Sequence, residues 1–488
     1  MNMYKPSLEE AKKLKSQGNL LPVYREINAD METPVSAYLK IARGNYSFLL
    51  ESVEGGERLA RYSFLGTEPA KVLTMGNDAV MVRQAHHERD NRDPLIVIEK
   101  EFKKYKPIVV DGLPRFHGGM VGYLSYEVAR YFEELPSPAA DPLKLPEARM
   151  MLADTLLVFD HLAHKIKVVA HAYLDGDIEK SYQEAKEKID SLVARLKKPL
   201  PEEILRQAQD ERNEVKANLT QAQYEEIVTK MKKHIYEGDI IQGVPSLRLG
   251  KSTKASPFAI YRALRSINPS PYMYFLHLDD IYIVGASPEL LVRVEDGIVS
   301  NHPIAGTRPR GKDNGDDKAL EAELKGDEKE RAEHVMLVDL ARNDVGRISE
   351  PGTVEVTQFM DIERYSHVMH IVSHVQGKLR EGLTQYDALR ACFPAGTVSG
   401  APKIRAMEII ADLEPDKRGP YAGAVGYFDF SGNIDTAIGI RTIIIKDGTA
   451  YVQAGAGIVA DSIPANEYRE CLNKMQATLS AIAQAEGD

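Results

Sequence analysis

The order of strand-like and helix-like segments is the feature that most constrains the fold of this chain. Strand-like segments come in runs as well as singly, separated by Gly, Pro and Asp residues and by helices. Successive strands that lack a helical crossover pair antiparallel. We therefore predict an α+β protein of large, mainly antiparallel β-sheets flanked by helices. First-half strands are expected at residues 46–51, 62–66, 70–74, 121–126, 155–160 and 165–172.

A polar linker divides the chain. A charged amphipathic helix is expected at about residues 177–198, and Pro199 ends it. The residues from there to about Asn218 are polar, and Thr220 with Gln223 caps a new helix. We predict an N-terminal domain at residues 1–215 and a second domain at residues 216–488. In the second, strands are expected at residues 240–248, 272–278, 282–285 and 291–295, and helices at 257–266, 327–342, 400–413 and 464–483.

Composition and charge exclude several classes of protein. The chain has 488 residues, of which 43% are hydrophobic and 27% charged, as is typical of a globular protein. Its formal net charge is −10, so no basic surface is available for nucleic acid or anionic lipid. It has two cysteines, no apolar leader and no stretch long enough to span a bilayer. We expect a soluble, cytoplasmic protein without a disulfide framework.

Common catalytic loops are missing from the sequence. There is no nucleotide-binding glycine loop and no G-x-S-x-G elbow, and neither cysteine lies in a recognisable nucleophile motif. His367, His370 and His374 lie in a β-rich segment, where only His370 and His374 share a strand face, which disfavours a zinc site. Two similar polar segments, residues 83–91 and 206–213, are interpreted as surface insertions.

Two predicted helices carry carboxylates that could act together. Glu330 and Glu333 are three residues apart and share a helix face, and Glu470 lies one turn before Lys474. These side chains could form solvated helix surfaces. Alternatively, Glu333 and Glu470 could converge on one Mg²⁺, which accepts a few carboxylates together with water and a substrate oxygen. Spacing alone leaves both interpretations open.

Loops of small residues offer places where an anion could bind. Gly455-Ala456-Gly457 follows a predicted strand, and glycines there let the backbone approach a ligand. Gly306 and Thr307 precede two arginines, while Thr397 and Ser399 place hydroxyls beside a helix start, where an anion is favoured. Each motif alone is also compatible with an ordinary turn.

Taken together, these segments resemble the chorismate-utilising enzymes, and within that family the large subunits of anthranilate synthases. The resemblance is carried, in family order over roughly residues 220–480, by EKERAEHVMLVDLARND, YSHVMHIVS, FPAGTVSGAPK, GYFDFSGNIDTAIGIRT and QAGAGIVADSIPANEYRECLNK. The first half matches through LLES and RYSFLG. The resemblance implies the family's fold and the conversion of chorismate and ammonia to anthranilate and pyruvate, the first committed step of L-tryptophan biosynthesis.

Two positions distinguish between branches of that family. Gln242 is one of the predicted catalytic residues. Family members that add water to chorismate carry a lysine at this position, and glutamine cannot replace lysine as a base toward water. Ala305 stands where aminodeoxychorismate synthases carry a lysine that can attack the substrate. Both positions favour the anthranilate branch. Aminodeoxychorismate synthesis is the nearest alternative, and a non-catalytic tryptophan sensor is an alternative of another class.

The resemblance also implies roles for individual residues. Glu333 and Glu470 match the pair that holds Mg²⁺ against a carboxylate of chorismate. Glu289 matches the general acid for the departing C4 hydroxyl, a role that requires a raised pKa. Thr397 and His370 match residues beside the reacting ring, and His370 is the candidate that assists pyruvate elimination. Positions matching those that bind the substrate's carboxylates are Gly306, Thr307, Tyr421, Arg441, Gly455, Ala456, Gly457 and Lys474, with Arg441 suited to a bidentate contact.

A partner and an effector follow from the same resemblance. The chain has no cysteine–histidine amidotransferase pattern, so a separate glutamine amidotransferase subunit is expected to supply ammonia, in a heterotetramer of two large and two small subunits. Feedback inhibition by L-tryptophan is expected, because both halves match the family's effector-binding segments. Glu51 and Ser52 are the candidates for its amino group, and Pro271, Tyr272 and Met273 are the candidates for its indole.

The sequence departs from the family around Gln242. The family usually reads Gln-Val-Val-x-Ser-(Gln/Arg)-Arg where this chain reads QGVPSLR. Gly243 is expected to weaken the predicted strand at this position, and Leu247 lacks the polar side-chain group of the usual glutamine or arginine. Cys471, beside Glu470, is also unusual and is interpreted as a small apolar residue.

Overall fold

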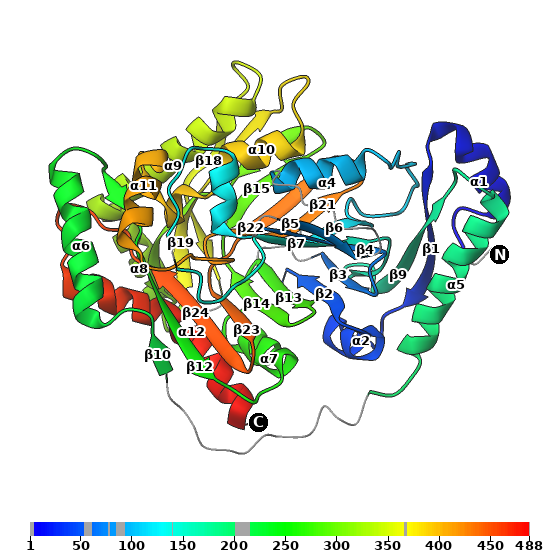
Figure 1. Cartoon of the computed structure of the whole chain (residues 1–488), viewed down its shortest axis with the longest axis horizontal. Coiled ribbons are helices and arrows are strands. Elements are labelled where there is room, and N and C mark those ends of the chain that lie inside the picture. Colours follow the sequence, from blue (N-terminus) through cyan, green and yellow to red (C-terminus); the bar gives the residue numbers. More distant parts are fainter. Residues whose placement is uncertain are drawn as a thin grey trace.

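The computed structural model describes residues 4–52, 61–76, 79–83, 93–138, 140–200, 215–365 and 368–487. Within them, two antiparallel sheets of eleven strands pack face to face, and helices cover their outer faces, which gives four layers (Figure 1). The apolar layer between the sheets includes Phe48 and Tyr274 from one sheet and Val121 and Val425 from the other. The α+β prediction with large antiparallel sheets is confirmed.

Each sheet contains strands from both halves of the chain. The first sheet runs, in spatial order, through β1 (Leu20–Asn28), β9 (Lys165–Tyr173), β8 (Thr155–Asp160), β3 (Tyr62–Thr67), β2 (Tyr46–Glu51), β13 (Tyr272–Leu278), β14 (Ile281–Ser287), β23 (Thr442–Lys446), β24 (Thr449–Gly455), β12 (Ser246–Ser252) and β10 (Val215–Ala217). The second runs through β17 (Ile304–Pro309), β19 (Val368–Lys378), β16 (Ile298–Asn301), β15 (Leu290–Glu295), β22 (Ile434–Ile438), β21 (Ala424–Asp429), β6 (Gly119–Leu124), β7 (Ala148–Ala153), β4 (Lys71–Gly76) and β5 (Ala79–Arg83), and β18 (Glu355–Arg364) pairs with β19.

The two halves are joined where β2 pairs with β13 and where β6 pairs with β21. The boundary near residue 215 therefore does not separate one sheet from the other, and the division into two domains stays a prediction. Of the two similar polar segments, only Arg83 at the end of β5 lies inside the described residues.

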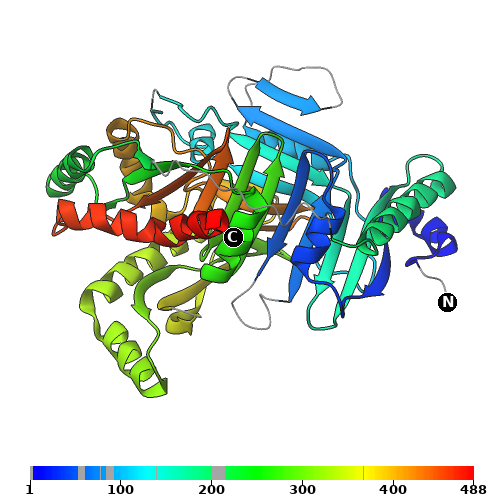
Figure 2. The same ribbon diagram turned by 90° about the horizontal axis from the view of Figure 1, so that it is seen from below.

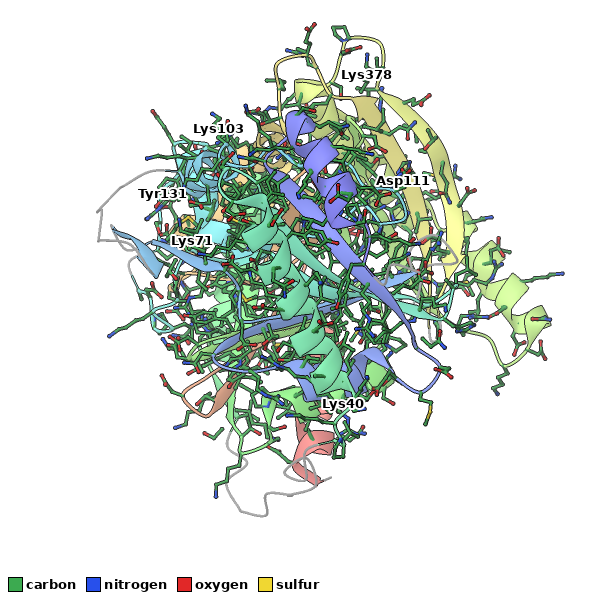
Figure 3. All side chains as sticks on the ribbon, turned by 90° about the vertical axis from the view of Figure 1, so that its right-hand side faces the viewer. Lys40, Lys71, Lys103, Asp111, Tyr131 and Lys378 are labelled. Carbon is green, nitrogen blue, oxygen red and sulfur yellow. The ribbon has the colours of Figure 1, made fainter. Side chains whose placement is uncertain are left out.

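Helices cover the outer faces of both sheets. Over the first sheet lie α1 (Leu8–Leu14), α2 (Pro34–Ile41), α5 (Ile178–Leu196), α6 (Gln221–Tyr236), α7 (Pro257–Ile267) and α12 (Pro464–Gly487). Figure 3 shows α5 and α1 crossing the outer face of this sheet near β1 and β9. Over the second lie α4 (Pro94–Phe102), α9 (Glu328–Ile348) and α10 (Gln385–Cys392), α11 (Lys403–Leu413) contacts both apolar clusters, and α8 (Asn314–Gly326) packs on β17 and β19. Among the described residues, none of the helices is both long and apolar enough to cross a membrane.

Most expected elements form, and the exceptions have local causes. β2, β8 and β13 cover the predicted residues, and Thr220 and Gln223 form the predicted capping box of α6. The strand expected at 240–248 is wrong as a single strand: it breaks into β11 (Gln242–Gly243), which pairs with β20 (Gly400–Ala401), and β12. The break falls at Pro245, which has no N–H to donate to a neighbouring strand. The helix expected from Gly400 begins at Lys403, because Gly400 and Ala401 form β20.

Acidification is expected to destabilise the protein through His171 on β9. Burial of its ring, and secondly the nearby His117, lowers the pKa of His171 from 6.5 to about 4. Between these values the unfolded chain binds more protons than the folded one, so stability falls as the pH drops, by roughly 2–3 kcal/mol at pH 4.5. We expect His171→Gln to reduce the difference in thermal stability between pH 7.5 and pH 4.5. An unchanged difference would contradict this account.

Candidate active site

The predicted site residues come from elements that meet beside one end of the two sheets. They lie on α9 and α12, on β17 and β19, on β11, at the end of β24, and in the short helix η4 (Gly396–Val398) before β20. Figure 2 shows α12 in red, running beside α6 along this part of the molecule. Residues as far apart in sequence as Gln242 and Glu470 are thereby gathered in one region.

Glu333 lies at the centre of a group of carboxylates. Burial raises its pKa, and the charges of Glu330 and Glu470 raise it further, while Lys474 and the Gln242 amide lower it. Glu333 and Glu470, which are predicted to hold one ion, therefore lie close enough to influence each other's charge. The convergence of Glu333 and Glu470 on one Mg²⁺ stays a prediction.

Lys474 links this group to the glycine loop. Its Nζ lies 2.6 Å from Glu470 Oε1 and donates to the carbonyl of Gly455 at 3.0 Å. A Cβ on Gly455 would lie 2.9 Å from the Tyr421 hydroxyl, so glycine allows that approach. A Cβ on Gly457 would collide with the amide nitrogen of Gln242. The loop therefore lies directly against three of the predicted site residues, and Ala456 is buried between its glycines.

Gly306 and Thr307 form a second edge of the site. The pairing of β17 with β19 shifts register between Ala305 and Thr307, and Gly306 has φ +62°, which glycine adopts without strain. This bulge brings the Gly306 carbonyl to His370, whose Nδ1–H donates to it at 2.8 Å. A Cβ on Gly306 would lie 3.1 Å from a carboxylate oxygen of Glu330, which places the bulge beside the carboxylate group.

His370 is held neutral, with its other nitrogen available. Burial lowers the pKa of His370, with an opposing effect from the Gly306 carbonyl, and the charge of Arg441 lowers it further. Because Nδ1 carries the proton given to Gly306, Nε2 keeps the lone pair that can accept one. The strand predicted for this segment is confirmed as β19, whereas His367 lies outside the described residues.

Glu289 is buried and Arg441 is partly buried, and the charge of each influences the pKa of the other. Burial raises the pKa of Glu289 to about 8, although the Thr397 hydroxyl, Arg441 and Lys474 act in the opposite direction. Burial lowers the pKa of Arg441, which Tyr421, Glu470 and Glu289 partly offset. Among the described residues, none forms an ion pair or side-chain hydrogen bond with the Arg441 guanidinium. Its donors are thus available for a carboxylate ligand.

The departures around Gln242 have packing explanations. A Cβ on Gly243 would collide with the sulfur of Met231 on α6, so glycine at position 243 leaves room for the Met231 side chain. Leu247 is fully buried in the apolar core between the first sheet and the helices on its outer face, where a polar group would be surrounded by apolar side chains. Cys471 is also buried, with Sγ 3.0 Å from the Tyr224 hydroxyl, which agrees with a packing role.

The predicted effector residues are only partly brought together. Glu51 and Met273 are directly paired across β2 and β13 and face α7, where Arg265 Nε donates to Glu51 Oε2 at 2.9 Å. The side chain of Tyr272 points to the opposite face, because successive strand residues alternate, and its hydroxyl donates to Asp435 at 3.0 Å. Pro271 is buried immediately before β13, and Ser52 immediately follows β2.

Two carboxylates belong to the site although they were not predicted as ligands. Glu330 raises the pKa of Glu333, and the charge of Glu470 raises that of Glu467, whose main cause is burial. Each lies three residues before a predicted ligand on the same helix. That spacing could have pointed to Glu330 and Glu467 from the sequence, because residues three apart share a helix face.

These residues fit a divalent cation that prefers oxygen ligands. Several carboxylates lie together in a partly desolvated place, where like charges penalise one another unless a cation compensates. Glu333 and Glu470 would supply oxygen ligands from two different helices, and Mg²⁺ needs few carboxylates because it keeps several waters. The donor set contains no thiolate or imidazole that would favour zinc instead.

Comparison with known proteins gives one family. Residues 45–480 match the family model described as chorismate binding enzyme. Anthranilate synthase component 1 of Acetivibrio thermocellus is 49% identical over 99% of both chains, and that of Pseudomonas aeruginosa is 50% identical over 98% of this chain and 99% of the other. The crystal structure of anthranilate synthase component I from Streptococcus pneumoniae has a TM-score of 0.79 at 39% identity, covering 93% of this chain and 98% of that one. The chain therefore belongs to the chorismate-binding enzymes, in the family of anthranilate synthase component 1 proteins.

Proposed function

We propose that this chain is the large subunit of an anthranilate synthase, a Mg²⁺-dependent carbon–oxygen lyase of the cytoplasm. It would convert chorismate and ammonia to anthranilate, pyruvate and water, as the committed step of L-tryptophan biosynthesis. The observation that carries the proposal is a buried acid, Glu289, whose pKa is influenced by Arg441, a partly buried cation without an ion pair among the described residues, which also lowers the pKa of the base His370.

Each residue type suits one part of that reaction. Arg441 would hold the enolpyruvyl carboxylate of chorismate, with Tyr421 and the two small-residue loops lining the substrate. Mg²⁺ held by Glu333 and Glu470 would supply Lewis-acid stabilisation of charge at the ring carboxylate. Glu289 would give its proton to the departing C4 hydroxyl as ammonia adds at C2. His370 Nε2 would then take the C2 proton as the enolpyruvyl group leaves as pyruvate.

Ammonia would come from a separate glutamine amidotransferase subunit. Glutamine hydrolysis by an amidotransferase needs an activated thiolate. Burial raises the pKa of both Cys392 and Cys471 to about 12, which keeps them protonated thiols. We propose a heterotetramer of two large and two small subunits, and we expect the isolated chain to use free ammonia at alkaline pH.

The test is a product assay with chorismate, Mg²⁺ and an ammonium salt. Anthranilate fluorescence and an equal amount of pyruvate would support the proposal. A 4-amino product that retains its enolpyruvyl group, without pyruvate, would instead identify an aminodeoxychorismate synthase. No turnover by a folded protein that still binds L-tryptophan would identify a sensor.

L-tryptophan is expected to bind beside Glu51 and to inhibit turnover. The chain contains no tryptophan, so all indole emission in the sample would come from the added L-tryptophan, and binding would appear as a shift of that emission. Glu51→Gln removes the negative charge that faces an amino group, and we expect it to raise the inhibition constant at least about tenfold, the cost of one charged hydrogen bond. Glu68→Gln, on the exposed surface beyond β3, is the control. Equal inhibition of both variants would contradict this site.

A further inference from the structure

Arg418 is a buried arginine outside the proposed reaction site. It lies between α11 and β21 and is 1% exposed. Its guanidinium donates from Nε to Glu414 Oε2 at 2.9 Å and from Nη2 to Glu414 Oε1 at 2.7 Å. It also donates from Nη1 to the carbonyl of Val398 at 2.8 Å and from Nη2 to that of Val244 at 2.6 Å. The side chain therefore joins three separate segments of the chain.

Two of those segments carry predicted site residues. Val244 follows Gln242 by two residues, and Val398 follows Thr397 directly. Both carbonyls lie where regular structure is interrupted, since β11 ends at Gly243 and η4 ends at Val398. Buried carbonyls need a donor, and Arg418 supplies one to each. The backbone already joins these two segments, through the Val244 N–H to the Ser399 carbonyl at 3.0 Å and the β11–β20 pair, and the Arg418 guanidinium adds a second, side-chain connection between them.

Glu414 extends the connection to a third site segment. Its Oε1 accepts from the Ser246 N–H at 2.7 Å and from the Ser246 hydroxyl at 2.9 Å. Gln453 Nε2 in turn donates to Ser246 Oγ at 2.8 Å. Gln453 lies two residues before Gly455 on β24. A continuous set of hydrogen bonds therefore runs from Arg418 through Glu414 and Ser246 to Gln453, on the strand that leads into the glycine loop.

We propose that Arg418, paired with Glu414, is a positioning residue for the reaction. It touches no substrate, but it fixes the segments of Gln242, Thr397 and Gly455 relative to one another. A buried ion pair adds little stability compared with apolar residues of the same size, so stability alone does not account for it. The planar guanidinium, with five donors in fixed directions, can serve one carboxylate and two carbonyls at once, whereas the lysine ammonium cannot. This inference rests on the proposed function.

Arg418→Lys is the main test, because it keeps the charge and loses the planar donors. We expect kcat for anthranilate formation to fall by about 10- to 100-fold, the effect of misplacing catalytic groups by about 1 Å, with a change in KM for chorismate below about threefold. A merely structural role would lower thermal stability without lowering kcat of the folded enzyme. Cooperative unfolding and kinetics are therefore measured on the same sample.

Arg248→Lys is the matched control. Arg248 is 5% exposed and pairs with Asp416 at 2.6 Å, two residues from Arg418, but it donates to neither Val244 nor Val398. We expect Arg248→Lys to lose comparable thermal stability with kcat within about threefold of the parent. If Arg418→Lys keeps kcat within that range, or if Arg248→Lys loses as much, the positioning role is wrong.

Ser246→Ala tests the same set of hydrogen bonds if Arg418→Lys fails to fold. It removes the hydroxyl between Glu414 and Gln453 and leaves both Arg418 carbonyl contacts in place. We expect kcat for anthranilate formation to fall about 3- to 10-fold, less than for Arg418→Lys because both carbonyl contacts remain, with a change in KM for chorismate below about threefold. An unchanged kcat would overturn the proposal. The parent protein in the same assay distinguishes the two failures, since a parent that forms no anthranilate and pyruvate would overturn the proposed function instead.

Discussion

Glu333→Gln is expected to lower kcat/KM for chorismate by at least about a thousandfold, because the metal-assisted stabilisation it removes contributes several kcal/mol. The substitution is nearly isosteric, and it replaces a partly buried carboxylate whose charge is disfavoured by its neighbours Glu330 and Glu470. Folding should therefore be retained or slightly stabilised. Glu470→Gln should cause a loss of the same order, since one carboxylate alone holds the cation weakly.

The measurement is anthranilate fluorescence against Mg²⁺ concentration, with thermal unfolding of each variant. Asp339→Asn is the control on the same helix, because Asp339 is exposed and pairs with Arg342 at 2.8 Å. It should leave the Mg²⁺ dependence unchanged. Near-native turnover by either glutamine variant would show that the two carboxylates do not hold the ion, and the proposed mechanism would fail.

Glu289→Gln is expected to lower kcat by about 10²–10⁴-fold, the usual contribution of a positioned general acid. Glutamine keeps the size of the buried side chain but has no acidic proton to give to the leaving hydroxyl. Burial raises the pKa of Glu289 to about 8, so the acid form predominates at neutral pH. The parent enzyme should lose activity as the pH rises through about 8, because the carboxyl then loses the proton that it must donate.

The pH profile distinguishes this role from a structural one. Rates should be divided by the concentration of neutral ammonia, because that nucleophile itself becomes more abundant at high pH. After this correction the parent should decline above pH 8, and Glu289→Gln should show no such decline. Glu295→Gln, farther along β15, is the control. A variant with parental kcat, or a parent without the decline, would contradict the role of Glu289.

Local chemistry explains why several elements could be predicted from the sequence. The capping box at Thr220 and Gln223 acts within one helical turn, and β2 and β13 have strand patterning over their whole length. The break at Pro245 could not be located in the same way. Pro245 is a local signal for a break, but the backbone groups freed there are satisfied by distant partners, such as Arg418 for the Val244 carbonyl, and the sequence does not show those partners.

The sequence by itself determined the fold class, the family and the identity of the candidate site residues, because strand patterning and ordered motifs are properties of short stretches of chain. The tertiary structure alone decided that Glu333 and Glu470 influence each other's charge, that Glu289 is buried enough to stay protonated, and that the Tyr272 side chain faces away from Glu51. Proximity and burial depend on how remote segments pack, and spacing along the chain carries no information about desolvation.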